Sequence, residues 1–431
     1  MAKLNGIHII YVVEDGISTL NCGVGTIASH LVSAFTEIAA IVERLENRLE
    51  LSIITLEPQP EAVGIRNDLR AYSISTCSSF NGNAYFIENL IEPRDDYFNF
   101  EIWELYNEKA IEIIREIADS TNLEVIVIAN DTIFAKTRLI ADKIINIWIP
   151  HSLSTIHEQS YVDNEMRWNW ESEAIEEIKD NKNCYVGYIS LFVKSILESS
   201  FKLSEQKLIP FLNGFHMQSL ERNLYSQHQV NIELQKRGIP IDKNLVFAFG
   251  RADEYKGLEI ALRSMISITE KHNFHGVLIA SAFSKEQFVS DIQQKLKDIL
   301  NSNTSNISLF LGYEFDLPKF ILQHSKTHFL LNLPTKDFCP LVPFEAELLG
   351  HNNLSVINSD IYCFQSVIKH KFDGFLCSPT VESAVMTFEQ IIELPEQIRK
   401  TVIQRGKQRS FNTMNIVENY GKAFDLILKK N

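Results

Sequence analysis

The stretch 245–258, Leu-Val-Phe-Ala-Phe-Gly-Arg-Ala-Asp-Glu-Tyr-Lys-Gly-Leu, predicts a strand, a short loop and the start of a helix. Its first five residues are apolar, as in a buried strand, and Gly250 ends that run. From Leu258 the apolar residues recur at helical spacing. The loop between them holds two cations, Arg251 and Lys256. Because ligands of open α/β sheets bind where such loops leave the carboxyl ends of strands, we expect a binding site here.

The chemistry of this loop suits phosphate. Arg251 presents a planar fork of N–H donors and Lys256 a point charge, and both bind phosphate oxygens well. Gly250 and Gly257 would let the backbone approach an anion closely. The alternative is that both cations are ordinary surface residues beside the two acidic residues of the loop.

The length, composition and net charge limit the number of domains and the kinds of partner that the chain can have. Its 431 residues allow two or three domains, and 45% hydrophobic with 22% charged residues is ordinary for a globular protein. The formal net charge of −14 argues against nucleic acid and anionic lipid surfaces as partners. An anionic ligand would therefore need a locally positive site, which gives the two cations more weight.

The cysteines and the apolar runs suggest a cellular location. The six cysteines are scattered and form no Cys-x-x-Cys motif, so we expect reduced thiols in a cytoplasmic protein. No apolar run approaches 18 residues, so no transmembrane helix is expected. The residues Met1 to Gly6 lead directly into a strand, so no signal peptide is expected.

Further candidate residues follow other predicted strands. Gly23 and Gly25 come after the strand 7–13 and open a helix, where backbone N–H groups face an anion or simply form a tight turn. The residues 133–143 are expected to form a helix that leads to the strand 145–149. His151 follows this strand, where a lone histidine is often structural. The region 57–100 has a poor pattern, and we interpret it as irregular.

Two carboxylates are separated by seven residues. Asp337 follows the strand 329–333, and Glu345 should lie in the first turns of the next helix. A glutamate at this position would be stabilised by the positive end of the helix dipole even without a ligand. Strands alternate with helices through both halves of the chain, which indicates α/β domains with parallel sheets.

In this order, the motifs resemble those of retaining glycosyltransferases of family 4, which have the GT-B fold. Gly-Arg-x4-Lys-Gly resembles their donor-phosphate loop, and Asp337-x7-Glu345 resembles their Glu-x7-Glu motif. The elements Gly-Val-Gly-Thr, His-Ser-Leu and Asn213-Gly214 match as well.

The resemblance implies two Rossmann-like, doubly wound domains that face a central cleft. The first would span 1–214, with 411–431 packing back onto it as a helix. A linker would cover 215–243, and a donor domain 244–410.

The resemblance also implies roles for single residues. His151 would approach the transferred sugar, Arg251 and Lys256 would stabilise the leaving diphosphate, and Asp337 would contact sugar hydroxyls. Glu345 would hold the ribose of the donor. The remaining donor-binding positions implied are Gly23, Gly25, Gly250, Gly312, Tyr313, Leu341 and Val342.

Two departures from the family pattern concern the sugar. Asp337 is one methylene shorter than glutamate. Where the family usually has Gly-Phe-Gly, this chain has Phe338-Cys339-Pro340. Pro340 has no N–H to donate, although the family uses backbone donors there.

The expected function is therefore transfer of a sugar, with retention of configuration, from a nucleoside-diphosphate sugar to a soluble hydroxyl acceptor. UDP is the expected nucleotide, and neither a metal nor a cofactor is expected. Two alternatives stay open: a GT-B relative without glycosyl transfer, such as a pseudo-glycosyltransferase or a regulatory nucleotide-sugar-binding subunit, and a transferase of cell-surface polysaccharide assembly. The sequence leaves the oligomeric state open.

Overall fold

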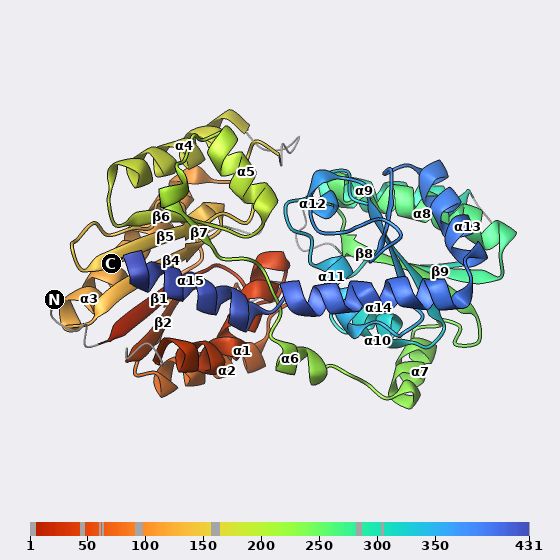
Figure 1. Cartoon of the computed structure of the whole chain (residues 1–431), viewed down its shortest axis with the longest axis horizontal. Helices are drawn as coiled ribbons and strands as arrows, with labels where there is room; N and C mark the ends of the chain where they lie inside the picture. Colours follow the sequence, from red (N-terminus) through yellow and green to blue (C-terminus); the bar gives the residue numbers. More distant parts are fainter. Residues whose placement is uncertain are drawn as a thin grey trace. The chain divides into compact units, whose positions relative to one another are not determined.

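The computed structural model describes residues 6–43, 48–59, 62, 64–90, 98–156, 164–281, 287–302 and 306–430. The chain divides into two compact units, one of Met1–His216 with Asn415–Asn431 and one of Met217–Met414 (Figure 1). Each unit is a parallel α/β domain.

In the first unit, seven strands among the described residues form one parallel sheet, in the order β3-β2-β1-β4-β5-β6-β7. The chain runs outward from β1 to β3 in one direction and from β4 to β7 in the other, so the order reverses between β1 and β4. The elements are β1 (Ile7–Val12), α1 (Gly23–Glu43), β2 (Leu49–Leu56), α2 (Asn67–Ser79), β3 (Ala84–Ile87), α3 (Phe100–Ser120), β4 (Glu124–Asn130), η1 (Thr132–Phe134), β5 (Ile144–Ile149), α4 (Asn164–Asp180), β6 (Cys184–Tyr188), α5 (Leu191–Ser199), η2 (Glu205–Lys207), β7 (Leu208–Pro210) and α15 (Ile416–Lys430).

The C-terminal helix α15 belongs to the first unit, where it lies beside α1 (Figure 1). The ring of Phe211 meets those of Tyr420 and Phe424 at centroid distances of 5.1 and 6.0 Å. The side-chain amide of Asn419 donates to the carbonyl of Asn213 at 3.1 Å. Aromatic packing and a buried hydrogen bond thus hold this distant segment in the first unit.

In the second unit, six described strands form a parallel sheet in the order β10-β9-β8-β11-β12-β13. Its order reverses between β8 and β11. The elements are α6 (Met217–Glu221), α7 (Gln227–Lys236), β8 (Asn244–Arg251), η3 (Glu254–Lys256), α8 (Leu258–Lys271), β9 (Phe274–Ser281), α9 (Gln287–Asn301), β10 (Ile307–Phe310), α10 (Leu317–Gln323), β11 (Thr327–Asn332), α11 (Val342–Leu349), β12 (Ser355–Ser359), α12 (Tyr362–Gln365), β13 (Phe375–Cys377), α13 (Val381–Glu393) and α14 (Glu396–Thr413).

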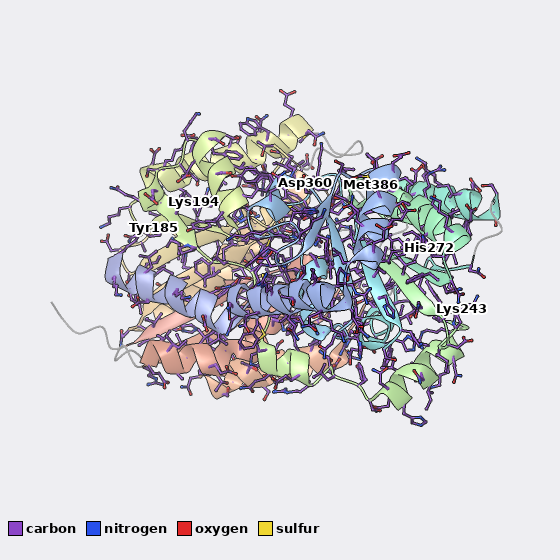
Figure 2. The ribbon with its side chains drawn as sticks, turned by 45° about the vertical axis from the view of Figure 1, so that its right-hand side comes forward. Tyr185, Lys194, Lys243, His272, Asp360 and Met386 are labelled. Carbon is purple, nitrogen blue, oxygen red and sulfur yellow. The ribbon has the colours of Figure 1, made fainter. Side chains whose placement is uncertain are left out.

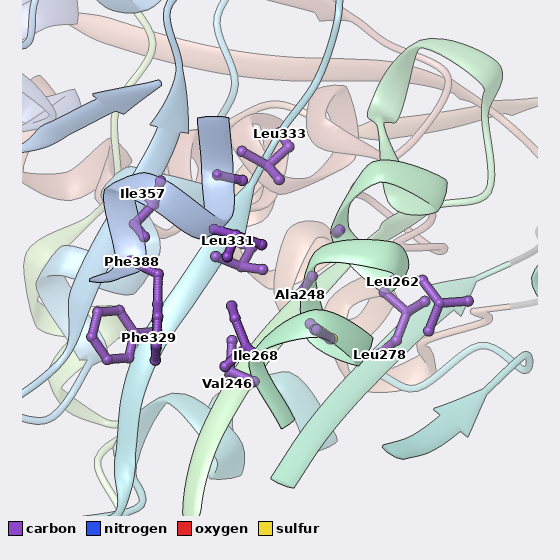
Figure 3. Packing of buried hydrophobic residues seen from close by; sticks show 14 of the residues in the cluster. Val246, Ala248, Leu262, Ile268, Leu278, Phe329, Leu331, Leu333, Ile357 and Phe388 are labelled. Atoms are coloured by element: carbon purple, nitrogen blue, oxygen red, sulfur yellow. The ribbon is translucent and has the colours of Figure 1, made fainter. Parts of the chain in front are cut away.

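The strand β8 is buried on both faces of this sheet. Successive side chains of a strand point to opposite faces. Val246 and Ala248 pack in one core with residues of α8 and α13 (Figure 3). Leu245 and Phe247 pack in the other core, with residues of α7 and α10. Helices on both faces explain why this strand is a continuous apolar run.

The two ends of the second sheet lie apart in Figure 2. Lys243 and His272 precede β8 and β9 and mark the amino ends of the strands. Asp360 directly follows β12 and lies on the other side of this unit, where the strands end at their carboxyl termini. The loops that carry the predicted donor-binding residues leave the sheet at this second end.

Two regions of the first unit differ from the expectation. The region 57–100 is not wholly irregular, because it contains α2 and β3. The buried residues of α2 are Ser73, Thr76 and Cys77, so no hydrophobic periodicity marks it. A helix expected over 133–143 is replaced by η1 and turns, since the amide of Asn146 bonds both the N–H and the carbonyl of Leu139 at 3.0 Å.

The expected linker, 215–243, begins in the first unit and continues into the second. Residues from Met217 onward belong to the second unit, and they include α6 and α7. Val230, Leu234 and Ile239 are buried in a core of that unit. From Met217 onward, this segment therefore belongs to the second unit.

The helix α1 is more apolar than the sequence reading assumed. Its 21 residues, with a mean hydropathy of 1.4 over the best window, are long and apolar enough to cross a membrane. Half of that window is buried inside the protein, where Leu31 and Phe35 pack in the core. A core helix passes the same test of length and composition, so this finding carries little weight alone.

Candidate functional site

The predicted donor-binding residues that follow β8 and β11 lie at the switch point of the second sheet. β8 and β11 are neighbouring parallel strands, and the chain order reverses between them. The loop 252–257 follows β8, and the loop 333–341 follows β11. The crevice at such a reversal is where open α/β sheets bind ligands.

Gly257 allows the first of these loops to pack closely against the second. Its φ of 65° lies in the left-handed region, and a Cβ there would stand 1.8 Å from the carbonyl oxygen of Leu333. Nearby, the N–H of Thr335 donates to the carbonyl of Tyr255 at 2.8 Å. Gly257 is therefore needed for backbone packing, which is a reason other than the expected approach to an anion.

Lys256 is paired with Asp337 across the two loops. Its Nζ lies 2.7 Å from Oδ2 of Asp337, and the two side chains are 28% and 8% exposed. Burial alone lowers the pKa of Lys256, but the carboxylate of Asp337 and the neighbouring Tyr255 outweigh it, so this pKa lies above its ordinary value. The ammonium therefore stays charged throughout the physiological range.

Arg251 is paired within its own loop. Its Nε donates to Oδ2 of Asp253 at 2.5 Å, and its Nη2 donates to the hydroxyl of Tyr255 at 2.8 Å. The Asp253 side chain is 8% exposed. Burial raises the pKa of Tyr255, so its hydroxyl is neutral. Each of the two cations thus has a buried carboxylate as its partner.

Asp337 has a different environment from the one expected. Its Oδ2 accepts from Lys256, and its Oδ1 accepts from the N–H of Phe338 at 2.8 Å. Both carboxylate oxygens therefore bond to the protein itself. Contact with sugar hydroxyls stays a prediction, and it would use the acceptor capacity that each oxygen retains beside these bonds.

Two other glycines leave open space beside their backbone. A Cβ on Gly250 would meet nothing closer than 4.0 Å, and one on Gly312 would meet nothing within 4 Å. Gly312 and Tyr313 follow β10, at the carboxyl end of the same sheet. The surroundings of Gly250 and Gly312 are compatible with a ligand lying against the main chain.

Glu345 lies in the first turn of α11, as the sequence predicted. Leu341 is the residue before this helix, and Val342 begins it. Burial raises the pKa of Glu345, and the ammonium of Lys319 opposes that shift. The helix start and the cation both stabilise the carboxylate. Its contact with the ribose of a donor stays a prediction.

In the first unit, described by itself, His151 follows β5, two strands from β1. Burial lowers the pKa of His151, and the nearby Asp131 carboxylate opposes this shift. Its Nε2 is buried and has no hydrogen-bond partner among the described residues. The imidazole is therefore neutral near pH 7, with one ring nitrogen available for a ligand.

Asp131 follows β4 at the switch point of the first sheet. Its φ of 66° is unusual for a residue other than glycine. Its N–H donates to the carbonyl of Ile149 at 2.9 Å, and its own carbonyl accepts from the indole of Trp148 at 2.9 Å. Both bonds hold a strained backbone beside His151, and such strain often occurs at functional sites.

A buried ion pair of α4 forms hydrogen bonds that hold the loop after His151 against this helix. Arg167 Nε lies 2.9 Å from Glu171 Oε1, with side chains 2% and 0% exposed. Arg167 also donates to the Ser152 hydroxyl at 2.8 Å. Glu171 accepts from the N–H and hydroxyl of Ser154 at 2.9 and 2.7 Å. These bonds position the loop that His151 begins.

The glycine loop of the first unit closes around one of its own carboxylates. Asp15 accepts from the Thr19 hydroxyl at 2.6 Å and from the N–H groups of Asn21 and Cys22 at 2.9 and 3.0 Å. A Cβ on Gly25 would stand 2.2 Å from Oδ2 of Asp15. The absence of a side chain at Gly25 thus has a structural reason, and its role toward a donor stays a prediction.

Gly23 is the first residue of α1, and it is exposed. An exposed helix start without a Cβ can accommodate an anion. For metals, no group of three His, Cys, Asp or Glu side chains comes together in the part of the chain that the structure describes.

The sequence reading missed three carboxylates that shape these sites. Asp253 lies two residues from Arg251, so local spacing could have suggested the pair. Asp131 follows a predicted strand directly, at the same sheet end as His151. Glu171 gave no signal toward this loop, because its partner Ser154 lies 17 residues earlier in the chain.

Comparison with known proteins agrees with this geometry. Residues 229–409 match the sequence family described as Glycosyl transferases group 1. This range includes Arg251, Lys256, Asp337 and Glu345. An uncharacterized glycosyltransferase of Methanocaldococcus jannaschii is 26% identical over 206 residues, which are 48% of this chain and 50% of that protein. The match thus spans half the length of the relative.

Solved structures resemble nearly the whole chain. Sucrose-phosphate synthase of Thermosynechococcus elongatus has a TM-score of 0.71 at 13% identity, with 98% of this chain and 100% of that chain covered. Anabaena HepE in complex with UDP and glucose has a TM-score of 0.66 at 13% identity, covering 98% and 99%. The trehalose-phosphate synthase of Burkholderia xenovorans in complex with glucose-6-phosphate has a TM-score of 0.68 at 11% identity. The match covers 98% of this chain and 100% of that chain.

At these identities the likeness establishes the fold, which is GT-B, with two parallel α/β domains. The family match in the second unit and the GT-B fold together support a GT-B glycosyltransferase.

Proposed function

We propose that this chain is a retaining glycosyltransferase of family 4. It transfers a sugar from a UDP-sugar to a hydroxyl group of a soluble acceptor in the cytoplasm, without a metal. The observation that carries the proposal is the pair of cations, Arg251 and Lys256, at the switch point of a sheet within the matched glycosyltransferase region. The complexes of Anabaena HepE with UDP and glucose and with UDP-glucose support UDP as the nucleotide.

The proposed chemistry follows from the charge of the leaving group. As the bond from the anomeric carbon to the diphosphate breaks, negative charge develops on the phosphate oxygens. Arg251 and Lys256 stabilise that charge, and positioned electrostatics of this kind is usually the largest catalytic contribution. The leaving phosphate accepts the proton of the acceptor hydroxyl on the same face of the sugar, so the configuration is retained.

In this proposal the first unit contributes His151. A neutral imidazole with a buried, unpartnered Nε2 suits a hydrogen bond to a sugar hydroxyl. Glu345 at the start of α11 holds the two ribose hydroxyls of the donor.

The first prediction concerns Lys256. Charged hydrogen bonds contribute about 1.5–3 kcal/mol each, so Lys256→Ala should lower kcat/KM for donor hydrolysis by about 10–150-fold. The assay measures release of free sugar from a panel of UDP- and GDP-sugars. The matched control is Lys271→Ala, which removes a 60% exposed cation at the other end of α8. Near wild-type turnover in Lys256→Ala, with both variants folded, would overturn the role of this residue.

A second candidate function is nucleotide-sugar binding without transfer, as in a pseudo-glycosyltransferase or a regulatory subunit. The observation that favours it is Asp337, whose two oxygens are already bonded to Lys256 and to the N–H of Phe338. In the same assay, binding of a UDP-sugar without release of sugar from any donor would select this candidate.

A further inference from the structure

The two predicted phosphate-binding cations are electrically neutralised by the protein itself. Asp253 lies 2.5 Å from Arg251, and Asp337 lies 2.7 Å from Lys256. Both carboxylates are 8% exposed, so water screens them weakly. The two pairs together therefore hold two positive and two negative charges, and Glu254 adds a further carboxylate to the loop after β8.

The two pairs differ in how they are built. Arg251 and Asp253 are two residues apart in one loop, so local backbone geometry brings them together. Lys256 and Asp337 come from loops after different strands, 81 residues apart in sequence. Those loops meet because Gly257 packs on the carbonyl of Leu333 and Thr335 bonds to Tyr255. The fold thus places the carboxylate of Asp337 beside Lys256, although the two residues are distant in sequence.

Lys256 can still bind a ligand while it is paired with Asp337. An ammonium has three N–H donors, and one of them points to Oδ2 of Asp337. The 28% exposure of the side chain leaves it accessible to a ligand. A phosphate oxygen can therefore bind Lys256 while Asp337 still holds it. The carboxylate then orients the ammonium and repels the incoming anion at the same time.

Resting on the proposed function, we propose that Asp337 is a positioning residue for Lys256 and an internal anion that competes with the diphosphate for it. It orients the ammonium for the charge that develops on the leaving group, and it weakens the binding of the nucleoside diphosphate, which favours product release. This role replaces contact between Asp337 and sugar hydroxyls.

The test uses ligands that contain no sugar. Binding of UDP and of inorganic pyrophosphate is measured by calorimetry on the full chain, and kcat is measured in the donor-hydrolysis assay. Asp337→Asn removes the charge and keeps the size of the side chain. Its UDP and pyrophosphate dissociation constants should fall by about tenfold, since a unit charge at this range shifts an ionic equilibrium by one to three powers of ten. Its kcat should fall, because Lys256 loses its fixed orientation.

Two controls separate this effect from general damage. Glu389→Gln removes the acidic partner of the exposed Lys271 in the same unit, at 3.3 Å, and should leave UDP affinity unchanged within about twofold. In a Lys256→Ala background, Asp337→Asn should tighten UDP binding less than it does in the wild type, because the ammonium that Asp337 neutralises is gone.

The outcomes are distinct. Unchanged UDP affinity in Asp337→Asn with weaker binding of the UDP-sugar would mean that Asp337 contacts the sugar, which overturns this inference and leaves the proposed function intact. Weaker UDP binding in a folded Asp337→Asn would overturn it as well. A wild-type chain that binds neither UDP nor pyrophosphate would overturn the proposed function.

Should Asp337→Asn fail to fold, Asp337→Glu keeps the question open to measurement. This variant retains the charge and adds one methylene, so it should bind UDP no more tightly than the wild type. Tighter binding in Asp337→Glu would contradict competition by charge.

Discussion

Two glycines of one loop, Gly250 and Gly257, have opposite surroundings. A methyl group on Gly257 would collide with the carbonyl of Leu333 and would sit on a backbone with φ of 65°. A methyl group on Gly250 would meet nothing closer than 4.0 Å in the protein. One glycine thus serves the packing of two loops, and the other leaves room for a ligand.

This contrast gives a paired prediction. Gly257→Ala should lower the free energy of unfolding by at least about 2 kcal/mol, since the left-handed backbone alone costs 1–2 kcal/mol. Gly250→Ala should change it by no more than about 1 kcal/mol, and should weaken UDP binding by about 10-fold or more if the diphosphate lies against this backbone. Urea titrations and calorimetry measure the two quantities. Equal destabilisation by both substitutions would contradict the assignment.

At the scale of elements, the helix α4 anchors the loop that follows His151. Arg167 and Glu171 form an ion pair that is almost completely buried, and Glu171 also accepts two bonds from Ser154. The same helix carries an exposed pair, Glu176 with Lys179 at 2.6 Å, in which the glutamate is 66% exposed. The two pairs differ mainly in burial.

Removing one partner of the buried pair should be far more costly. Glu171→Gln removes the negative charge that faces the buried guanidinium of Arg167, and we expect a loss of about 3–5 kcal/mol in the free energy of unfolding. Glu176→Gln should cost less than about 1 kcal/mol. Chemical denaturation of both variants at neutral pH measures the difference. If the two losses were alike, the buried pair would not be what holds this loop.

Elements with a clear hydrophobic pattern could be predicted from the sequence, and so could their order. The strand, loop and helix of 245–258 are present as β8, η3 and α8. The expected helix over 133–143 was wrong, because the side chain of Asn146 takes the backbone bonds of Leu139, and periodicity does not report such a bond. The helix α2 was missed because its buried positions are small or polar.

The position of the candidate site could be predicted, but the partners of its residues could not. Arg251 and Lys256 lie at the end of β8, as strand–loop–helix patterning indicates. The pairing of Lys256 with Asp337 depends on β8 and β11 being neighbours, and strand order is a property of the folded sheet. For the same reason, contacts of Asp131 and Asp15 became visible only in the structure.

At the scale of the whole molecule, four histidines, two buried and two partly buried, link stability to pH. Burial lowers the pKa values of His8, His275, His324 and His328 to about 4, from an ordinary value of 6.5. In the unfolded chain they take up protons below about pH 6.5, whereas in the folded chain they stay neutral down to about 4. Stability should therefore be lost as the pH falls through this window.

The loss should be unequal between the two units. His275, His324 and His328 belong to the second unit, and His8 belongs to the first, as does His151, whose pKa burial also lowers. Each such histidine changes the free energy of unfolding by at most about 1.4 kcal/mol per pH unit in this window. The change is smaller for the partly exposed His275 and His328. The second unit should therefore unfold first when the pH is lowered.

The distribution of tryptophan makes this difference measurable in the unmodified chain. The four tryptophans, Trp103, Trp148, Trp168 and Trp170, all lie in the first unit. Tryptophan fluorescence thus reports that unit alone, whereas far-UV circular dichroism reports helices and strands of both. In urea titrations at about pH 5, the dichroism transition should begin at a lower concentration than the fluorescence transition, and the gap should be smaller at about pH 7.5. Fluorescence changing first at about pH 5, or coincident transitions at both pH values, would contradict a second unit weakened by its histidines.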